Sequence, residues 1–430
     1  MTQELKPQSP DAPSVVVVAD DLTGATDSSV QFAYAGWKTQ LLLSEDSVTH
    51  REPGAVSALV TDARALTRAD AQNRTRAAVL SGHDAATRLY LKIDSTMRGT
   101  ISSQIDGALE AWQQDHPGAF ALVCPAYPAM GRTVSDGQLL VNGTPVQDTV
   151  IGRDPVTPVS TSSLSELLPG SATVTKPHGE TFTVAALVAS IRTARASSPI
   201  IIIDAGESAD LDVIAEAAVE FGDDVVPVGS AGLAAALAVK WGTGLVAPAE
   251  SDRTCERVII VASSLHTVTR EQVQALVDVE PPEVQATEVT VLTPDLTALS
   301  DEAARSAWLE TVSSTASTPI VIVDAPEERT SSTDLVADLL AGAAATLMRD
   351  SVPTSLMLLG GEGARAVLNR LGAVSLHIHS TVREGMPIGA IEGGRAHGAT
   401  VITKAGGFGR RSDVLEIAAE LLHNNEGSTQ

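Results

Sequence analysis

Short, uninterrupted runs of β-branched and other apolar residues recur along this chain, and several end in small or acidic residues. A continuous apolar run is typical of a strand buried on both faces, as in a parallel sheet covered by helices on both sides. Stretches rich in Ala and Leu with helical spacing lie between the runs, at residues 210–221, 332–348 and 364–371. This alternation predicts an α/β fold with mainly parallel sheets. The apolar runs are residues 15–18, 200–203, 258–261, 320–323 and 356–359.

The length and one change of composition predict two domains. At roughly 150 residues per domain, a chain of 430 residues holds two or three. A stretch rich in Gly, Pro and polar residues, 242–256, separates an expected helix from the next expected strand. Such stretches are typical of linkers, so we place the boundary there and predict domains of residues 1–245 and 253–430.

The charge balance limits the partners that this chain can bind. It has 29 Lys and Arg against 53 Asp and Glu, a formal net charge of −24, and 3% aromatic residues. A polyanion is repelled by this charge, and few rings are available to stack on bases, so we expect neither nucleic acid nor a membrane as partner. The N-terminus lacks the basic and apolar regions of a signal peptide, and no apolar run reaches membrane-spanning length. These features predict a cytoplasmic protein.

Two adjacent carboxylates, Asp20 and Asp21, follow the first predicted strand and precede Thr23 at the start of an expected helix. An Asp in this position can serve as a general base or bind substrate hydroxyls or a metal, and it can also simply cap the helix. The residue pattern leaves both interpretations open.

A second polar cluster extends from Lys92 to Gly99 and includes Asp94, Ser95 and Arg98. Cations beside hydroxyls in an acidic chain indicate a binding site for a small anion. Arg can bind a carboxylate with two parallel hydrogen bonds. A surface ion pair ahead of a helix is the alternative.

A further cation, Arg132, lies in a loop rich in Pro and Gly after the predicted strand 119–123. Such loops are common, so this signal is weak by itself.

Glycine-rich turns dominate the second half of the chain. Residues 360–363 join a predicted strand to a helix, and residues 404–409 follow the predicted strand 399–403. Glycines at such turns let backbone N–H groups approach phosphates. No Lys in the sequence directly follows a Gly, which excludes a Walker A loop. Gly361-x-Gly363-x-x-Ala366 fits a variant of the dinucleotide-binding motif, but the acidic residue that this motif needs at the end of the next strand is missing. With the serines at 263 and 264, the turns favour a polyphosphate site.

Five motifs, taken in order, resemble the four-carbon acid sugar kinase family over nearly the whole chain. They are residues 20–27, 92–99, 125–133, 229–233 and 404–409. An ordered match of this length is far more specific than any one of the motifs.

The resemblance implies that residues 1–245 bind the acid sugar and residues 253–430 bind ATP. It implies phosphorylation of the terminal hydroxyl of a substrate such as threonate, erythronate or 3-oxo-tetronate. The positions that would face the sugar acid are Asp20, Asp21, Thr23, Lys92, Asp94, Ser95, Arg98 and Arg132. Those that would face the nucleotide are Ser264, His266, Gly360, Gly361, Glu362, Gly363, Gly406 and Gly407.

Two positions depart from the family pattern. Many relatives resemble Gly-Ser-Cys-Ser where this chain has Ser263-Ser264-Leu265-His266, so His266 is expected to supply one nucleotide contact. Relatives often read Gly-Gly-Glu-Thr where this chain ends the turn with Gly363, which removes a hydroxyl.

We therefore predict two α/β domains closing on an inter-domain cleft and ATP-dependent phosphoryl transfer, with Mg²⁺ bridging the phosphates. In this scheme Asp20 or Asp21 accepts the hydroxyl proton, and Arg98, Arg132 or Lys92 holds the carboxylate of the sugar acid. The alternatives are an NADP-dependent oxidoreductase and a non-catalytic, two-lobed sugar-acid binding protein. The metal ligands and the stereochemistry of the sugar acid stay unassigned, and a homodimer is compatible with this interpretation.

Overall fold

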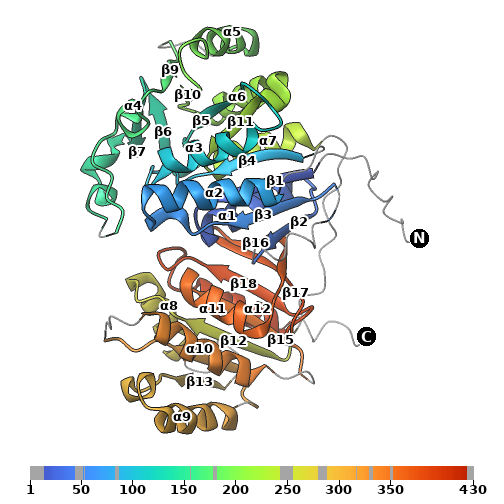
Figure 1. Cartoon of the computed structure of the whole chain (residues 1–430). Coiled ribbons are helices and arrows are strands. Elements are labelled where there is room, and N and C mark those ends of the chain that lie inside the picture. The colour runs from blue at the N-terminus through green and yellow to red at the C-terminus, as the bar shows by residue number, and fades with distance from the viewer. Residues whose placement is uncertain are drawn as a thin grey trace. The chain divides into compact units, whose positions relative to one another are not determined.

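The computed structural model describes residues 14–43, 52, 54–82, 87–154, 156–177, 182–242, 255–278, 288–315, 317–328, 333–348 and 352–423. The chain divides into two compact units, Met1–Pro248 and Ala249–Gln430 (Figure 1). Most of the stretch that predicts the domain boundary, residues 243–254, lies outside the described residues.

The first unit is built on a sheet in which all the described strand pairs are parallel. In spatial order its strands are β2 (Thr39–Leu42), β3 (Val56–Val60), β1 (Ser14–Ala19), β4 (Thr87–Lys92), β11 (Val225–Gly229), β5 (Phe120–Cys124), β10 (Ile200–Ile203) and β9 (Ala172–Val174).

Helices pack in two groups on this sheet. One group is α2 (Arg68–Gly82) with α3 (Ile101–Trp112), and the other is α1 (Leu22–Tyr34), α7 (Ala231–Trp241), α6 (Ser208–Phe221) and α5 (Val184–Ala194). A small antiparallel sheet, β6 (Arg132–Ser135), β7 (Gln138–Val141) and β8 (Thr144–Pro145), and the short helix α4 (Leu164–Leu167) complete the unit.

The second unit has a mixed sheet. Its order is β13 (Val289–Leu292), β14 (Ile320–Asp324), β12 (Arg257–Ala262), β15 (Thr354–Leu359), β18 (Thr400–Lys404), β17 (Met386–Glu392) and β16 (Ser375–Arg383). The pairs from β13 to β18 are parallel, and β17 is antiparallel to both of its neighbours. The helices α9 (Glu302–Ser314), α10 (Thr333–Leu347) and α11 (Gly361–Leu371) pack in one series, and α8 (Thr267–Val277) packs on α12 (Asp413–His423).

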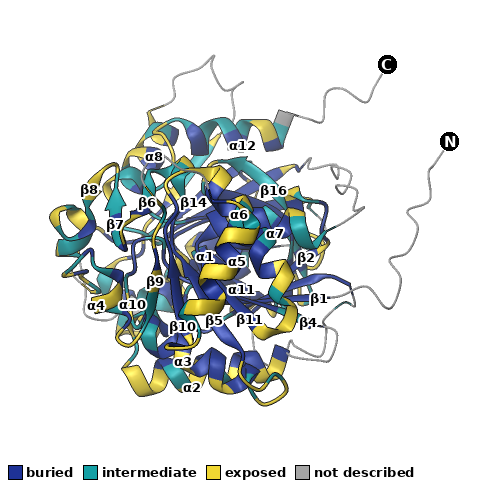
Figure 2. Cartoon of the chain, turned by 90° about the horizontal axis from the view of Figure 1, so that it is seen from above, coloured by how far each residue is buried: buried dark blue, intermediate teal, exposed yellow. Residues whose placement is uncertain are grey.

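The core confirms the fold that the apolar runs predict. Each of the five runs forms a strand, namely β1, β10, β12, β14 and β15, and their apolar side chains are buried. Figure 2 shows the strands as buried elements and exposed residues on the outer turns of the helices. Within the described residues, no helix is both long enough and apolar enough to cross a membrane.

Candidate functional site

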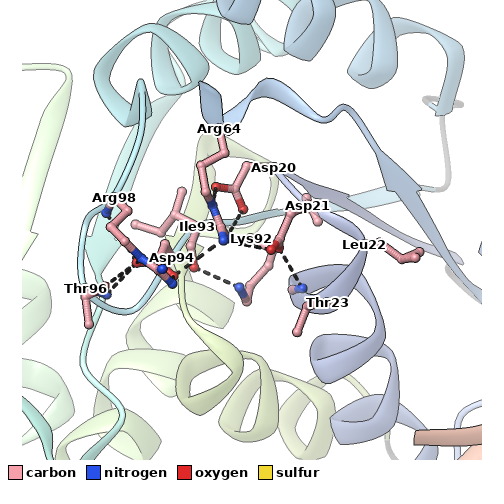
Figure 3. Close-up of polar contacts among 12 residues, drawn as sticks. Asp20, Asp21, Leu22, Thr23, Arg64, Lys92, Ile93, Asp94, Thr96 and Arg98 are labelled. Atoms are coloured by element: carbon pink, nitrogen blue, oxygen red, sulfur yellow. Dashed lines mark hydrogen bonds and ion pairs between the residues drawn. The ribbon is translucent and has the colours of Figure 1, made fainter. Parts of the chain in front are cut away.

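Strands β1 and β4 bring the two polar motifs of the first unit together. They pair in parallel with Ala19 opposite Lys92, so the residues that follow each strand meet at one edge of the sheet (Figure 3). Asp20 and Asp21 follow β1, and Asp94 follows β4. Because β4 ends at Lys92, Asp94 lies in the turn that follows the strand, where Met97 N donates to Asp94 O at 3.0 Å.

Arg64 joins these carboxylates, and it is the site residue that sequence reasoning missed. Its Nε donates to Asp20 Oδ2 at 2.8 Å and its Nη2 to Asp20 Oδ1 at 2.9 Å. Its Nη1 lies 2.7 Å from Asp21 Oδ2, and its Nη2 lies 3.7 Å from Asp94 Oδ1. Arg64 lies in the short 3₁₀ turn Ala63–Ala65 after β3, the strand on the other side of β1. One guanidinium thus neutralises part of the charge of three carboxylates (Figure 3).

Burial makes the pairing between Arg64 and Asp20 obligatory. Asp20 is fully buried, which raises its pKa, and the neighbouring Asp21 acts in the same direction while Arg64 opposes both. Burial also acts to lower the pKa of Arg64, but Asp20, Asp21 and Asp94 hold that pKa well above its usual value. Since both oxygens of Asp20 are bound by Arg64, its role in this structure is to hold that cation in place.

Asp21 differs from Asp20 in exposure. Its side chain is 28% exposed, whereas that of Asp20 is 0% exposed. Asp21 is also the N-cap of α1, where its Oδ1 accepts a hydrogen bond from Gly24 N at 2.7 Å. The capping role is therefore confirmed for Asp21, and one face of its carboxylate stays within reach of a ligand. Thr23 lies half-buried in the first turn of the same helix.

Arg98 binds a carboxylate of this chain, Asp94. Its Nε donates to Asp94 Oδ2 at 3.0 Å and its Nη2 to Asp94 Oδ1 at 2.9 Å, and its Nη1 lies 3.4 Å from Asp154 Oδ2. Burial acts to raise the pKa of Asp94, but Arg98 and Arg64 outweigh it and hold that pKa well below its usual range. The hydroxyl of Thr96 also donates to Asp94. The two-pronged donor of Arg98 is thus already occupied.

Next to Arg64 and Arg98, Lys92 is the cation of this cluster that has N–H donors left for a ligand. Its side chain is buried, and Nζ donates to Ile93 O at 2.9 Å, which is the one hydrogen bond from Nζ among the described residues. A Cβ atom on Gly24 would lie 2.6 Å from Nζ, so this glycine lets the ammonium approach the first turn of α1. An ammonium has three N–H donors, so two can serve a ligand.

The structure places Ser95 in the turn after β4, half-buried beside Asp94. Arg132 begins β6, and its Nη1 donates to Met130 O. The described contacts of Arg132 link it to its own loop and not to the cluster around Arg64.

The predicted nucleotide residues of the second unit lie together. They follow β12, β15 and β18, which are adjacent and parallel. Ser264 N donates to Leu359 O at 3.1 Å, and Gly360 N donates to Lys404 O at 2.8 Å, so backbone hydrogen bonds tie the three segments to one another. Ser264 and His266 belong to the first segment, Gly360, Gly361, Glu362 and Gly363 to the second, and Gly406 and Gly407 to the third.

Close packing explains three of these glycines. A Cβ atom on Gly360 or Gly363 would fall on the Ser263 side chain, and one on Gly406 would fall on Ser264 Oγ. Gly360 also has a φ of +125°, which residues other than glycine rarely adopt. Gly361 differs, because a Cβ there would meet no atom within 4 Å. Its side of the turn is open to a ligand.

The cluster offers hydrogen-bond donors. Gly360 is the N-cap of α11 and provides no side-chain acceptor for the first N–H groups of this helix. His266 caps α8, since its Nδ1 accepts from Val268 N at 3.2 Å. The neutral ring then carries its proton on Nε2, and a Cβ atom on Gly407 would lie 3.2 Å from that nitrogen. N–H donors at helix N-termini are the chemistry that binds phosphate.

The described part of the chain contains no group of three or more His, Cys, Asp or Glu side chains that could hold a metal ion. In the cluster around Arg64, the carboxylates of Asp20, Asp21 and Asp94 are paired with the guanidinium groups of Arg64 and Arg98.

Family models match both units. The model of a sugar-binding N-terminal domain covers residues 15–237, and that of a nucleotide-binding C-terminal domain covers residues 259–413. These matches define a protein with a sugar-binding unit followed by a nucleotide-binding unit. The chain belongs to the four-carbon acid sugar kinase family, whose members are phosphotransferases with an alcohol group as acceptor.

Two curated relatives align over nearly their whole length. The D-threonate kinase of Bordetella bronchiseptica is 38% identical over 421 residues, which cover 95% of this chain and 98% of the relative. The D-threonate kinase of Salmonella typhimurium is 30% identical over 428 residues, which cover 94% and 97%. A solved structure described as a putative tRNA synthase from Salmonella typhimurium LT2 has a TM-score of 0.77 at 21% identity over 95% of this chain and 99% of that one. At this identity the likeness confirms the fold alone.

Replacing Asp94 by Asn should destabilise the first unit, because Arg98 then loses its buried carboxylate partner. Breaking such a pair costs about 3 kcal/mol of unfolding free energy. Since the pKa of Asp94 is held below its usual range, its contribution is complete above the unfolded pKa near 4 and is lost as the pH falls further. Denaturant unfolding at pH 7 should therefore separate Asp94→Asn from the wild type, and the difference should shrink below about pH 4.

The exposed Asp212 on α6 provides the control. Asp212→Asn should change the unfolding free energy by less than about 0.5 kcal/mol. An Asp94→Asn protein as stable as this control would show that the ion pair contributes nothing to the fold.

Proposed function

We propose that this protein is an ATP-dependent kinase that transfers the terminal phosphoryl group of ATP to the terminal hydroxyl of a four-carbon acid sugar. The observation that carries the proposal is that one chain has both matched domains, each with its polar residues gathered at the carboxyl ends of adjacent strands. Both relatives reported above are D-threonate kinases, so D-threonate is the first substrate to test. Family membership favours the kinase over an NADP-dependent oxidoreductase or a non-catalytic binding protein.

Asp21 is the better candidate for the group that accepts the hydroxyl proton. A general base must come within hydrogen-bonding distance of the proton that it removes. Both carboxylates have partners for both oxygens, but Asp20 is fully buried against Arg64, whereas the Asp21 side chain is 28% exposed at the N-terminus of α1. Phosphoryl transfer needs mainly positioning and charge stabilisation, so orienting the hydroxyl is as important a task for Asp21 as accepting its proton.

Lys92 is the better candidate for binding the carboxylate of the sugar acid. The guanidinium groups of Arg64 and Arg98 are held by Asp20, Asp21 and Asp94. Lys92 is buried, has donors left, and lies against Gly24 in the first turn of α1, where the helix dipole also favours an anion. Thr23 and Ser95 are close in sequence to these groups and are candidates for the substrate hydroxyls.

The nucleotide binds through the second unit in this proposal. The N–H groups at the start of α11, the loop at Gly406 and Gly407, Ser264 and the Nε2 of His266 would contact phosphate. ATP is taken as its Mg²⁺ complex, with the phosphates as the main ligands of the ion, because Mg²⁺ prefers phosphate and water oxygens to an all-protein cage. ATP is available in the cytoplasm, which supports a cytoplasmic location for an enzyme that uses it. That the protein forms a homodimer stays a prediction.

A coupled assay with ATP, Mg²⁺ and a panel of four-carbon acid sugars tests the proposal. ADP formation that depends on one of these acids, with phosphate recovered on its terminal oxygen, is the expected result. Binding without turnover would indicate a binding protein, and turnover with NADP⁺ in place of ATP would indicate an oxidoreductase.

Replacing Asp21 by Asn should lower kcat without unfolding the protein. Asn can still cap α1, and loss of a general base typically lowers kcat by about 10²–10⁴-fold. The KM for MgATP should stay close to the wild-type value. Asp301→Asn is a matched control, since Asp301 is the N-cap of α9 and its Oδ1 accepts a hydrogen bond from Ala303 N at 2.9 Å. A folded Asp21→Asn enzyme with normal kcat, alongside a folded Asp20→Asn enzyme without activity, would reverse the two roles.

Replacing Lys92 by Met should raise the KM for the sugar acid while leaving the KM for MgATP unchanged. Lys176→Met is the matched control in the same unit, because the Lys176 ammonium is bound by Asp210 at 2.6 Å and Glu207 at 3.0 Å. Steady-state kinetics with both substrates provide the measurement. If Arg98→Lys raises this KM and Lys92→Met does not, the carboxylate is bound at Arg98.

Replacing Gly361 by Val should raise the KM for MgATP by about tenfold or more, because one lost charge-assisted hydrogen bond is worth about that factor. A Cβ atom at this position meets no atom within 4 Å, so the melting temperature should stay near that of the wild type. Gly363→Ala is the contrasting variant, since its Cβ would fall on Ser263 and should lower the melting temperature. An equal rise in both KM values for Gly361→Val would point to general damage rather than to a phosphate contact.

A further inference from the structure

The ammonium of Lys404 is surrounded by oxygen atoms at the end of β18. Its Nζ lies 3.0 Å from Ala405 O, 3.1 Å from Gly406 O, 3.1 Å from Phe408 O and 3.3 Å from Thr269 Oγ1. The side chain is buried. Three of the four partners are carbonyl groups of the loop that contains Gly406 and Gly407.

Helix α8 holds the same loop from a second direction. Thr269 Oγ1 donates to Gly406 O at 2.8 Å, so its own lone pair is free to accept from Lys404. Gln272 Nε2 donates to Phe408 O at 3.2 Å and to Arg410 O at 2.9 Å. The loop carbonyls therefore point toward Lys404 and α8.

Peptide geometry fixes where the N–H groups of the loop point. In a planar trans peptide the C=O of one residue and the N–H of the next are on opposite sides, and the described residues contain no cis peptide bond. Since the carbonyls of Ala405 and Gly406 face the ammonium, the N–H groups of Gly406 and Gly407 point away from it. No hydrogen bond described for this part of the chain uses either of these N–H groups. Successive N–H groups that point the same way form an anion-binding concavity.

We propose that Lys404 is a positioning residue for the nucleotide, whose ammonium orders the loop carbonyls so that the N–H groups of Gly406 and Gly407 present themselves to a phosphate. The proposal rests on the nucleotide site proposed above. Lys404 itself does not touch the phosphate, because the loop backbone lies between the two. The loop is the binding surface, and the cation behind it sets its conformation.

The proposed role of Lys404 makes the affinity for MgATP depend on pH. Burial lowers the pKa of Lys404 to about 8, and Asp413 acts against that shift. Other charged or titratable groups near the loop are His266 at the start of α8, Arg270 of α8, which donates to Ser264 O at 2.8 Å, and Arg410, which pairs with Asp413 at 2.9 Å and lies 3.7 Å from Glu416. As the pH rises through 8, Lys404 loses its proton and its nitrogen lone pair then faces carbonyl oxygens. Affinity for MgATP should therefore fall above about pH 8.

The first experiment compares Lys404→Met with Arg257→Met in the full-length protein. Arg257 is also a buried cation that donates to a carbonyl, Leu347 O at 2.6 Å, but it begins β12 and so lies at the other end of the sheet from the glycine turns. Both changes should lower the melting temperature. Only Lys404→Met should raise the dissociation constant of MgATP, by about tenfold or more, with the KM for the sugar acid unchanged.

The second experiment measures MgATP binding by calorimetry from pH 6.5 to 9.5 in the wild type and in His266→Asn. Asn can still cap α8, and the imidazole beside Gly407 is then absent. Loss of affinity above about pH 8 should persist in His266→Asn and be absent from Lys404→Met. The pH dependence of MgATP binding in the wild type tests the proposal even when Lys404→Met does not fold.

Two results would overturn the proposal. One is wild-type affinity for MgATP in a folded Lys404→Met protein, and the other is an affinity that does not change with pH in the wild type and in His266→Asn. A wild-type protein that fails to bind MgATP at every pH would contradict the nucleotide site itself, which is a different outcome.

Discussion

Arg64 allows three carboxylates to share one edge of a sheet. The ends of β1 and β4 bring Asp20, Asp21 and Asp94 together, and without a cation among them their mutual repulsion and the burial of Asp20 would oppose folding. A guanidinium is suited to this task because it keeps its charge at every physiological pH and presents donors in a rigid plane. Its contacts leave Asp21 as the more exposed carboxylate of the adjacent pair and leave Lys92 with free donors. The proposed division of work among these residues follows from that one pairing.

The two units use a buried cation in different ways. In the first unit Arg64 and Arg98 meet formal negative charges, which fixes side chains. In the second unit Lys404 meets carbonyl dipoles, which fixes a backbone loop. Dipoles compensate a buried charge less fully than carboxylates do, which agrees with the lowered pKa of Lys404 and the raised pKa of Arg64.

The fold could be predicted because its cause is local in sequence. A run such as Ile200–Ile203 has no polar residue to expose, so burial on both faces is its only favourable state, and the structure confirms it as β10. The positions of the glycine turns could also be predicted, since each turn follows a strand and starts a helix or loop. That Gly360 and Gly363 are small because Ser263 packs against them could not be predicted, as the contact spans about a hundred residues of sequence.

The ion pairs of the site could not be predicted for the same reason. Arg64 lies 44 residues from Asp20, in a segment with no motif, and only the order β3-β1-β4 brings it to the carboxylates. Its one sequence signal is its place just after the strand Val56–Val60. The sequence indicates that Arg98 is suited to bind a carboxylate, but it does not say which one. The turn at Met97, with a φ of +62°, brings Arg98 back to Asp94, four residues earlier.

The contact between Lys92 and Gly24 has a consequence for the empty protein. An ammonium beside the first turn of a helix lies next to the positive end of the helix dipole, so the two repel each other. The fold tolerates this local conflict because Asp20 and Asp21 lie close by, but an anion bound at Lys92 would relieve it directly. If the carboxylate of the sugar acid binds at Lys92 as proposed, the first unit gains stability from its own substrate.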